Sequence, residues 1–452
     1  MTLPSPTATK VAPGPRGYPL VGILPKMWSN PLDFFLNSAE EYGDVVLLKF
    51  GSRNGYLFNN PDDIQYILQT NYQNFQKSTT VSVVESVLGS GLATNEGASW
   101  LKQRRIMQPA FHREVVARLG DTMVREASRL FPLWDNLAKS GAPINIFVQM
   151  MRLTQNIIVE TMFGGDIDDR AAKIGNAWST VLQYFNASAW ALVSIPPTWP
   201  TRRNRDFHAA LALLNEETSQ IIRRSESLPP EEIPDLLALL MAARDDESGQ
   251  GMSEKQLRDE IMTIFLAGHE TTADTLTWTF YMLSQYPEIR EKLQQELAAV
   301  LNGQLPSPAD FPKLVYTQKV IQEAIRLYPP FWLIYRTPVV PDEIGGYRVE
   351  PGDYVFISPY VIHRSPKYWN APNTANPDRF DENVTSRFAY IPFGAGPRRC
   401  IGEQMALLEA TLSLAAIAQR YQFDLVSGQE VFPEAQVTLR PRGGIRMNMK
   451  QR

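Results

Sequence analysis

The sequence contains almost no cysteine: Cys400 is the single one among 452 residues. This excludes an internal disulfide and any zinc or iron–sulfur site that is built from several cysteines. Histidine is scarce too, with four residues, and none forms a local catalytic signature beside Cys400. A nucleophilic cysteine needs a nearby base. A buried bystander and a single thiolate ligand are therefore the two roles that remain for this thiol.

An excess of positive charge and long apolar runs are also missing. With 44 basic and 48 acidic residues the net charge is −4, and no Lys/Arg-rich block indicates a nucleic-acid partner. The first residues contain neither a basic, apolar leader nor about 20 consecutive apolar residues, so we expect a cytoplasmic protein without a transmembrane anchor. In the absence of repeats and flexible linkers, we expect a proline-rich tail over residues 1–17 and one domain over 18–452.

The surroundings of Cys400 favour the ligand role. Residues 393–402 read Phe-Gly-Ala-Gly-Pro-Arg-Arg-Cys-Ile-Gly, and a strongly helical run follows Gly402. The glycines allow a flat group to approach the backbone closely, while the two arginines favour the thiolate. A helix that begins just after Cys400 adds free N–H groups and a favourable dipole.

A second unusual stretch lies in the middle of a long predicted helix. Ser253-x-x-Gln256 is a capping box, and the apolar pattern continues to Gln285 before Tyr286-Pro287 ends it. A helix of about 32 residues would span roughly 48 Å and must cross the core. Its centre nevertheless reads Ala-Gly-His-Glu-Thr-Thr over residues 267–272. Glycine, a charge and two alcohols weaken a core helix, which indicates a functional site.

Both stretches resemble the cytochrome P-450 (haem-thiolate monooxygenase) superfamily, in which Phe-x-x-Gly-x-Arg-x-Cys-x-Gly binds haem. The resemblance covers almost the whole chain and is nearest to soluble, bacterial-type members, including fatty-acid hydroxylases. It implies the cytochrome P-450 fold, mainly α with a smaller β-rich region, with haem between the long central helix and the Cys-ligand loop. Cys400 would then be the axial thiolate ligand of haem b iron, with O2 as co-substrate and electrons ultimately from NAD(P)H.

The resemblance also assigns roles to individual residues. Catalytic proton delivery falls to Thr271 and Glu270, whereas His269 receives no catalytic role. The expected haem contacts are Trp100, Arg104, Ala267, Gly268, Arg336, Phe393, Arg398, Cys400 and Gly402. The expected substrate pocket comprises Val84, Val87, Thr263, Ala267, Phe331, Trp332, Leu333 and Leu439. A structural network of Glu323, Arg326 and Arg379 is expected to support the haem-binding loop.

The reaction implied by the resemblance inserts one oxygen atom of O2 into a C–H bond of a lipophilic substrate. We favour a fatty acid, with a terpenoid or retinoid-like substrate as the alternative. An isomerase or dehydratase, and a ligand-binding haem sensor, are further alternatives on the same scaffold. We expect no attached redox domain and therefore a separate ferredoxin or flavodoxin with its reductase, docking near Lys102, Arg105, Arg113 and Arg399.

Local patterns predict several further elements. Residues 45–58 read as a hairpin with its turn at Asn54-Gly55, and a helix is expected from Pro61. Residues 77–99 read mainly as loop, and the resemblance makes this the segment over the substrate. The aromatic and proline-rich residues 189–200 break the helical pattern, as a lid would. Strand pairs are expected between 347–349 and 354–357, and around 437–441.

Overall fold

The computed structural model describes residues 10–77, 82–163, 168–189, 196–229, 235–245, 247–381 and 386–452. Within these ranges, no helix is both long enough and apolar enough to cross a membrane. The chain forms two compact units. The first contains Met1–Thr80, Arg326–Thr374 and Arg379–Cys400, and the second contains Val81–Ile325, Ala375–Asp378 and Ile401–Arg452. The expected single domain over residues 18–452 stays a prediction.

The first unit is built on a sheet of five strands in the order β1-β2-β8-β5-β3. The strands are β1 Val45–Phe50, β2 Arg53–Phe58, β3 Phe75–Gln76, β5 Ile334–Pro338 and β8 Tyr354–Ile357. β1 and β2 form the predicted hairpin, but Phe50 pairs with Arg53, so the turn lies at Gly51-Ser52 rather than at Asn54-Gly55. This register places the four apolar residues at the start of β1 opposite the apolar end of β2, and both stretches are buried. Burial of these residues therefore outweighs the local turn signal.

Short helices and a second hairpin complete the first unit. The α-helices are α1 Leu24–Ser29, α2 Pro31–Tyr42, α3 Pro61–Gln65 and α16 Pro359–Ile362. The short π- and 3-10 helices are η1 Tyr66–Thr70, η2 Tyr72–Asn74, η7 Arg387–Ala389 and η8 Gly396–Arg398, and η6 Pro377–Asp381 spans the boundary between the units. The predicted pairing of residues 347–349 with 354–357 is wrong: β7 Tyr347–Val349 pairs with β6 Asp342–Ile344 instead. Gly345 and Gly346, both with positive φ, form the tight turn that this hairpin needs.

The second unit is mainly helical. Its helices are α4 Ser82–Leu88, α5 Gly97–Met107, η3 Gln108–Phe111, α6 Arg113–Arg118, α7 Gly120–Arg129, α8 Phe131–Ser140, α9 Ile146–Phe163, α10 Asp168–Ala189, α11 Arg202–Glu226, α12 Asp235–Ala242, α13 Glu254–Gln285, α14 Pro287–Leu301, η5 Pro308–Lys313 and α17 Glu403–Arg420. α15 Val315–Leu327 begins in this unit and ends in the first. Its strands are β4 Ile144–Asn145, β9 Tyr421–Leu425, β10 Pro433–Ala435, β11 Leu439–Pro441 and β12 Arg446–Gln451. β4-β12-β9 form one sheet, and β10-β11 form the predicted late pair.

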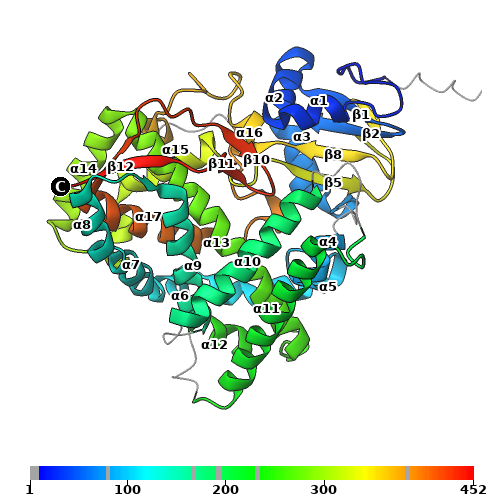
Figure 1. Cartoon of the computed structure of the whole chain (residues 1–452). Coiled ribbons are helices and arrows are strands. Elements are labelled where there is room, and N and C mark those ends of the chain that lie inside the picture. The colour runs from blue at the N-terminus through cyan, green and yellow to red at the C-terminus, as the bar shows by residue number, and fades with distance from the viewer. Residues whose placement is uncertain are drawn as a thin grey trace, which may run out of the picture. The chain divides into compact units, whose positions relative to one another are not determined.

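The central helix α13 matches its prediction at both ends. Its 32 residues begin after Ser253, whose hydroxyl accepts the N–H of Gln256 at 3.2 Å. It ends at Gln285, directly before Tyr286-Pro287. α13 lies alongside α9 and α17 (Figure 1) and is buried over most of its length. It therefore forms the core axis of the second unit.

The segment before α5 differs from its prediction. Residues 77–99 were expected to be mainly loop, but Ser82–Leu88 form α4, which packs against α13. Residues 78–81 lie outside the described residues, as do 190–195 in the predicted lid. α10 ends at Ala189 and α11 begins at Arg202, so the expected break in the helical pattern is confirmed.

Candidate functional site

Cys400 ends a tightly folded loop of the first unit. Its N–H donates to Phe393 O at 2.9 Å, which closes the loop, and its side chain is exposed. Gly396 has a φ of +67°, and a Cβ there would lie 1.8 Å from the carbonyl oxygen of Leu68. Only glycine fits this approach to η1. Next along the chain, Gly402 caps α17, so the predicted position of Cys400 just before a helix is confirmed.

A chain of hydrogen bonds supports this loop from α15. The guanidinium of Arg326, which is fully buried, donates to His363 O at 2.7 Å. The His363 ring accepts the N–H of Ile391 at 2.9 Å, two residues before Phe393. Burial and then the charges of Arg326 and Arg364 hold the pKa of His363 well below its usual range, so the ring is neutral and can accept. Arg326 thus acts on the loop through His363.

Of the other two members of the expected network, Arg379 shares a carbonyl oxygen with Arg326, and Glu323 binds a backbone N–H of the second unit. Arg379 donates to Thr374 O at 3.1 Å, and Arg326 approaches the same oxygen at 3.4 Å. Both guanidinium groups also lie over the ring of Trp369, so they share one binding region in the first unit. Glu323, fully buried in the second unit, accepts the N–H of Asn376 at 2.8 Å. The network of all three residues stays a prediction.

The middle of α13 has one open face. Between Ile261 and Phe280, a stretch described without gaps, every residue is buried except Leu266, Ala267, Gly268 and Thr271. Ala267 and Thr271 lie one turn apart, and the Thr271 hydroxyl donates to Ala267 O at 2.7 Å. We call Ala267, Gly268 and Thr271 the open face. Small side chains on an otherwise buried helix are suited to contact with a flat group.

The residues beside the open face point in other directions. The ring of His269 lies against Met151 O on α9 at 3.2 Å, and burial lowers its pKa to about 4. His269 is therefore neutral and part of the packing between α9 and α13. Glu270 is 2% exposed and accepts the hydroxyl of Thr438 at 2.8 Å, while Arg440 lies 3.9 Å from it. Burial raises the pKa of Glu270, and these two neighbours offset part of that rise.

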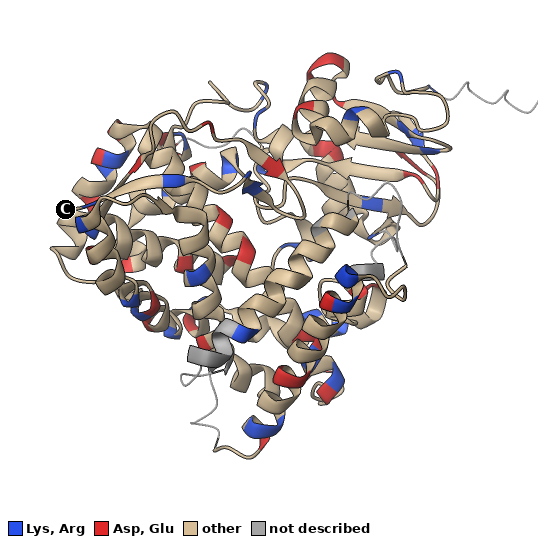
Figure 2. Ribbon diagram, in the orientation of Figure 1, with Lys and Arg blue, Asp and Glu red and all other residues tan. Residues whose placement is uncertain are grey.

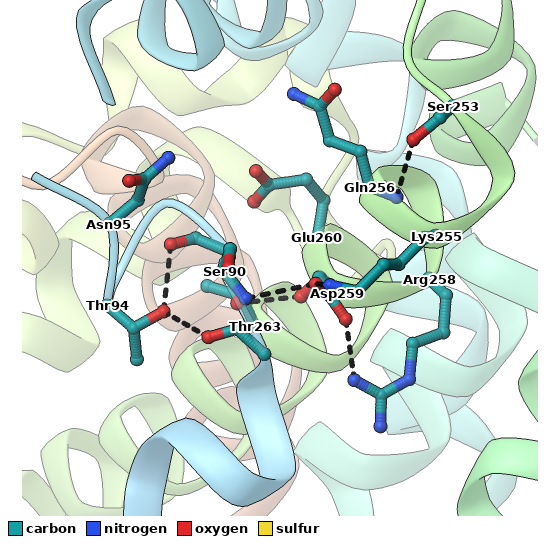
Figure 3. A network of polar contacts seen from close by, with 12 residues as sticks. Ser90, Thr94, Asn95, Ser253, Lys255, Gln256, Arg258, Asp259, Glu260 and Thr263 are labelled. Atoms are coloured by element: carbon teal, nitrogen blue, oxygen red, sulfur yellow. Dashed lines mark hydrogen bonds and ion pairs between the residues drawn. The ribbon is translucent and has the colours of Figure 1, made fainter. Parts of the chain in front are cut away.

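The turn after α4 is fixed to the first half of α13 by two adjacent carboxylates, and Figure 3 shows the bond between Ser90 and Asp259. Asp259 accepts the N–H of Ser90 and Glu260 accepts the N–H of Leu92, each at 2.9 Å. Asp259 also binds Lys255 and Arg258. The approach is close because a Cβ at Gly89 would lie 2.3 Å from the Asp259 carboxylate. We call Gly89–Leu92 the anchored turn.

Several predicted pocket residues lie at this junction in the second unit. Val87 on α4 is fully buried and Val84 is half-buried. Thr263 lies under the anchored turn, because a Cβ at Gly91 would meet its hydroxyl oxygen at 2.1 Å. Leu439 on β11 is also buried, and its carbonyl accepts the indole N–H of Trp278 at 2.8 Å. Their contact with substrate stays a prediction.

The other predicted contacts are divided between the units. In the first unit, Phe331 is 47% exposed and Leu333 is half-buried, whereas Trp332 is 4% exposed and packs against Phe35. Arg336 on β5 donates to Tyr335 O at 2.8 Å, and Arg398 is half-buried in η8. In the second unit, α5 carries Trp100, which is buried, and Arg104, which is half-buried. Their roles toward haem stay predictions.

Two residues of the predicted redox-partner surface are already paired. Arg105 binds Glu247 and Asp245, and Lys102 lies 3.9 Å from the same Asp245. Acidic and basic segments are mixed along the ribbon rather than gathered by sign (Figure 2). Arg113, in contrast, is exposed. The positive field at Lys102 and Arg105 is therefore weaker than the sequence alone indicates.

Sequence reasoning missed four polar residues of the site. Thr438 and Arg440 flank Leu439, which the sequence did single out, but they meet Glu270 from 168 and 170 positions further along the chain. No local signal shows such a contact. His363 was visible only as one of four histidines. Asp274, in contrast, follows Glu270 at the spacing of one helical turn and could have been found from that spacing.

The described residues fit haem as a bound group. The Cys400 thiol is exposed at the end of a tightly folded loop, and the helix that follows favours a thiolate. The open face of α13 presents only small groups. A Cβ at Gly268 would meet only Ile158, at the ordinary contact distance of 3.4 Å, so packing inside the second unit does not demand glycine there. Close approach of a flat group to the helix would explain why residue 268 is glycine.

Comparison with known proteins agrees with this geometry. The family model described as Cytochrome P450 matches residues 12–448. Cyclooctatin synthase of Streptomyces melanosporofaciens is 37% identical over 442 residues, covering 97% of this chain and 94% of that protein. Cyclooctat-9-en-7-ol 5-monooxygenase of the same organism is 31% identical, covering 94% and 91%. Pentalenene oxygenase of Streptomyces avermitilis is 29% identical, covering 97% of both chains.

Proposed function

The chain belongs to the cytochrome P450 family, and we propose that it hydroxylates a C–H bond of a terpenoid with electrons from a separate ferredoxin or flavodoxin and its reductase. As a member of this family it is a haem-thiolate monooxygenase that binds haem b, consumes O2 and uses electrons derived from NAD(P)H. The thiolate ligand is Cys400, because the chain has no other cysteine. The isomerase, dehydratase and sensor alternatives gain no support from these relatives.

The terpenoid assignment is supported by the names of the relatives. Cyclooctatin synthase, cyclooctat-9-en-7-ol 5-monooxygenase and pentalenene oxygenase each cover more than nine-tenths of the chain and are terpenoid-related. The fatty acid that the sequence favoured finds no such support. The terpenoid alternative therefore becomes the leading proposal for the substrate class.

The open face of α13, next to the buried Glu270, is the observation that carries the proposed mechanism. Bound haem supplies the activation of O2 and the oxidation of the C–H bond. The Thr271 hydroxyl donates its proton to Ala267 O at 2.7 Å. Its oxygen therefore still has lone pairs that can accept a proton, or a hydrogen bond from water, on the open face. By rotating, this hydroxyl can donate its own proton there instead.

Glu270 is suited to supply that proton. Burial favours its protonated form, while Thr438 and Arg440 favour the carboxylate. Opposed influences of this kind allow a carboxyl group to take up and release a proton during a reaction. We infer that Glu270 passes protons from the interior of the second unit to Thr271, and that Ala267 and Gly268 leave room for O2 and the flat cofactor.

Substrate binding and turnover test the proposal. The purified holoprotein is titrated with cyclic terpenoid hydrocarbons and alcohols, and with fatty acids of matched carbon number, while the haem spin state is followed by absorption. We expect a spin-state shift with terpenoids, and NADH-dependent incorporation of 18O from 18O2 when a ferredoxin and reductase are added. A shift and oxygen incorporation with fatty acids alone would overturn the terpenoid assignment.

A pair of variants tests the role of Thr271. Thr271→Ala removes the hydroxyl from the open face, whereas Thr271→Ser keeps it. We expect Thr271→Ala to consume NADH with much less product per NADH, and Thr271→Ser to retain most of the wild-type yield. Equal yields in the two variants would contradict proton delivery at this position.

A further inference from the structure

Asp274 is a buried carboxyl group for which the mechanism above has no role. It lies on α13 one turn after Glu270, and its relative exposure is 0%. Among the described residues, neither of its carboxyl oxygens has a hydrogen-bond partner. An ionised carboxylate without partners is strongly unfavourable in the interior of a protein. The geometry therefore indicates that Asp274 holds a proton.

Three groups interact electrostatically with Asp274 and determine what its proton can do. Glu270 lies on the same helix, Thr438 precedes β11, and Arg440 lies within it. The Thr438 hydroxyl has a single proton, which it donates to Glu270 at 2.8 Å. Its oxygen still has a lone pair that can accept from a protonated Asp274. A small movement that brings Asp274 within hydrogen-bond distance of Thr438 would therefore let one hydroxyl join the two carboxyl groups.

The electrostatics agree with this assignment of the protons. Burial, followed by the charge of Glu270, raises the pKa of Asp274 well above its usual range, and Thr438 and Arg440 offset only part of the rise. Arg440 is close to Glu270, at 3.9 Å, and favours the ionised form there. When two buried carboxyl groups interact in this way, one of them keeps its proton. In this pair that group is Asp274.

We propose that Asp274 stores a proton and passes it to Glu270 through the hydroxyl of Thr438, and so reloads Glu270 after each proton that Glu270 delivers. The O–H bond of Asp274 breaks and its proton joins Thr438 Oγ1, while the proton of Thr438 moves to Glu270 Oε1. One proton is transferred and no electrons move. Asp274 acts through Glu270, so it is a positioning residue for proton supply. The inference rests on the proposed function.

Polar side chains extend from the buried pair toward the surface along β10 and β11. Arg440 donates to Gln436 Oε1, and Gln436 Nε2 donates to Glu434 Oε2 at 2.6 Å. The side chain of Glu434 is 33% exposed. A guanidinium and an amide do not relay protons along these bonds, so they only mark the polar side of the buried pair, and solvent water that enters on that side is the proton source.

Infrared spectroscopy of the holoprotein tests the protonation state without turnover. We expect a band from a protonated, buried carboxyl group near neutral pH, and its loss in Asp274→Asn, whose side chain has nearly the same shape. Glu409→Gln on α17 is the matched control, because Glu409 is also buried, has a side-chain oxygen without a partner, and has a raised pKa. An Asp274→Asn spectrum that keeps the whole wild-type band overturns the proposal.

Turnover tests the relay itself. In Asp274→Asn we expect product per NADH to fall by about tenfold, less than the roughly 10²- to 10⁴-fold that a direct proton donor contributes. The solvent hydrogen isotope effect should rise and the pH profile of kcat should change, which a purely structural role would not cause. Thr438→Val should share the defect and Thr438→Ser should restore the yield, while Glu409→Gln stays at the wild-type yield.

The outcomes separate this inference from the proposed function. Wild-type protein that oxidises no terpenoid contradicts the proposed function, and the same variants are then compared with whichever substrate the wild type oxidises. Wild-type yield and an unchanged isotope effect in both Asp274→Asn and Thr438→Val contradict the relay, even if terpenoid oxidation is established.

Discussion

Replacing Glu260 by Gln should flatten the pH dependence of the stability of this protein. Glu260 is fully buried on α13, and its Oε2 accepts the N–H of Leu92 in the anchored turn. Burial raises its pKa from 4.5 to about 7. A carboxyl with a raised pKa in the folded state favours folding most below its unfolded pKa, and this contribution is lost as the pH rises through the folded pKa. The expected window therefore runs from about pH 4.5 to 7.

The size of the effect follows from the two pKa values. The change from 4.5 to about 7 corresponds to about 3 kcal/mol, at roughly 1.4 kcal/mol for each pH unit. Gln keeps the oxygen that accepts from Leu92 but cannot ionise. The free energy of unfolding of Glu260→Gln, relative to wild type, should therefore rise by up to about 3 kcal/mol across this window.

Chemical denaturation of the holoprotein at several pH values between 4 and 8 measures this difference. Asp259→Asn is the matched control on the neighbouring residue. Although burial opposes it, the bonds from Lys255 and Arg258 lower the pKa of Asp259, so its contribution is present above the unfolded pKa and is lost as the pH falls. That loss lies below the unfolded value of 3.8, so between pH 4 and 8 the difference between Asp259→Asn and wild type should stay nearly constant while that of Glu260→Gln rises. Parallel pH curves for Glu260→Gln and wild type would refute the reasoning.

Two further predictions concern the loop support and electron delivery. Glu323→Ala leaves the N–H of Asn376 without its acceptor, at a cost of about 1–3 kcal/mol. Haem should therefore dissociate faster from Glu323→Ala than from Glu323→Gln. Transfer of haem to apomyoglobin measures both rates, and equal rates would contradict this prediction. Arg105→Glu should slow reduction by the ferredoxin less than Arg113→Glu, because Glu247 already pairs with Arg105 while Arg113 is exposed. Stopped-flow reduction at low salt measures both rates, and a larger effect at Arg105 would refute that order.

The features that could be predicted best from the sequence are those determined by residues that are neighbours in the chain. Ser253 and Tyr286-Pro287 bound α13 because a capping residue and a proline act on their immediate neighbours. The Cys400 loop was equally visible, since its glycines and its following helix are adjacent in the chain. Helix α4 was overlooked because a short run that is rich in valine shows its helical spacing weakly.

What the sequence could not show depends on distant contacts. The first hairpin turns at Gly51 rather than at Asn54 because burial of both strands sets the register. The acceptor role of His363 depends on its meeting Ile391, and the environment of Glu270 is set by β11. Such contacts join segments that only tertiary folding brings together, so residue type and spacing alone do not reveal them.

The central claim is that Cys400 supplies the thiolate of a haem monooxygenase, and one absorption measurement tests it most directly. The purified holoprotein is reduced and exposed to carbon monoxide, beside Cys400→Ser prepared in the same way. The account predicts a strongly red-shifted Soret band in the wild type that is lost in the variant. A wild type without this band after haem-supplemented expression, or a Cys400→Ser protein that keeps it, would contradict the account.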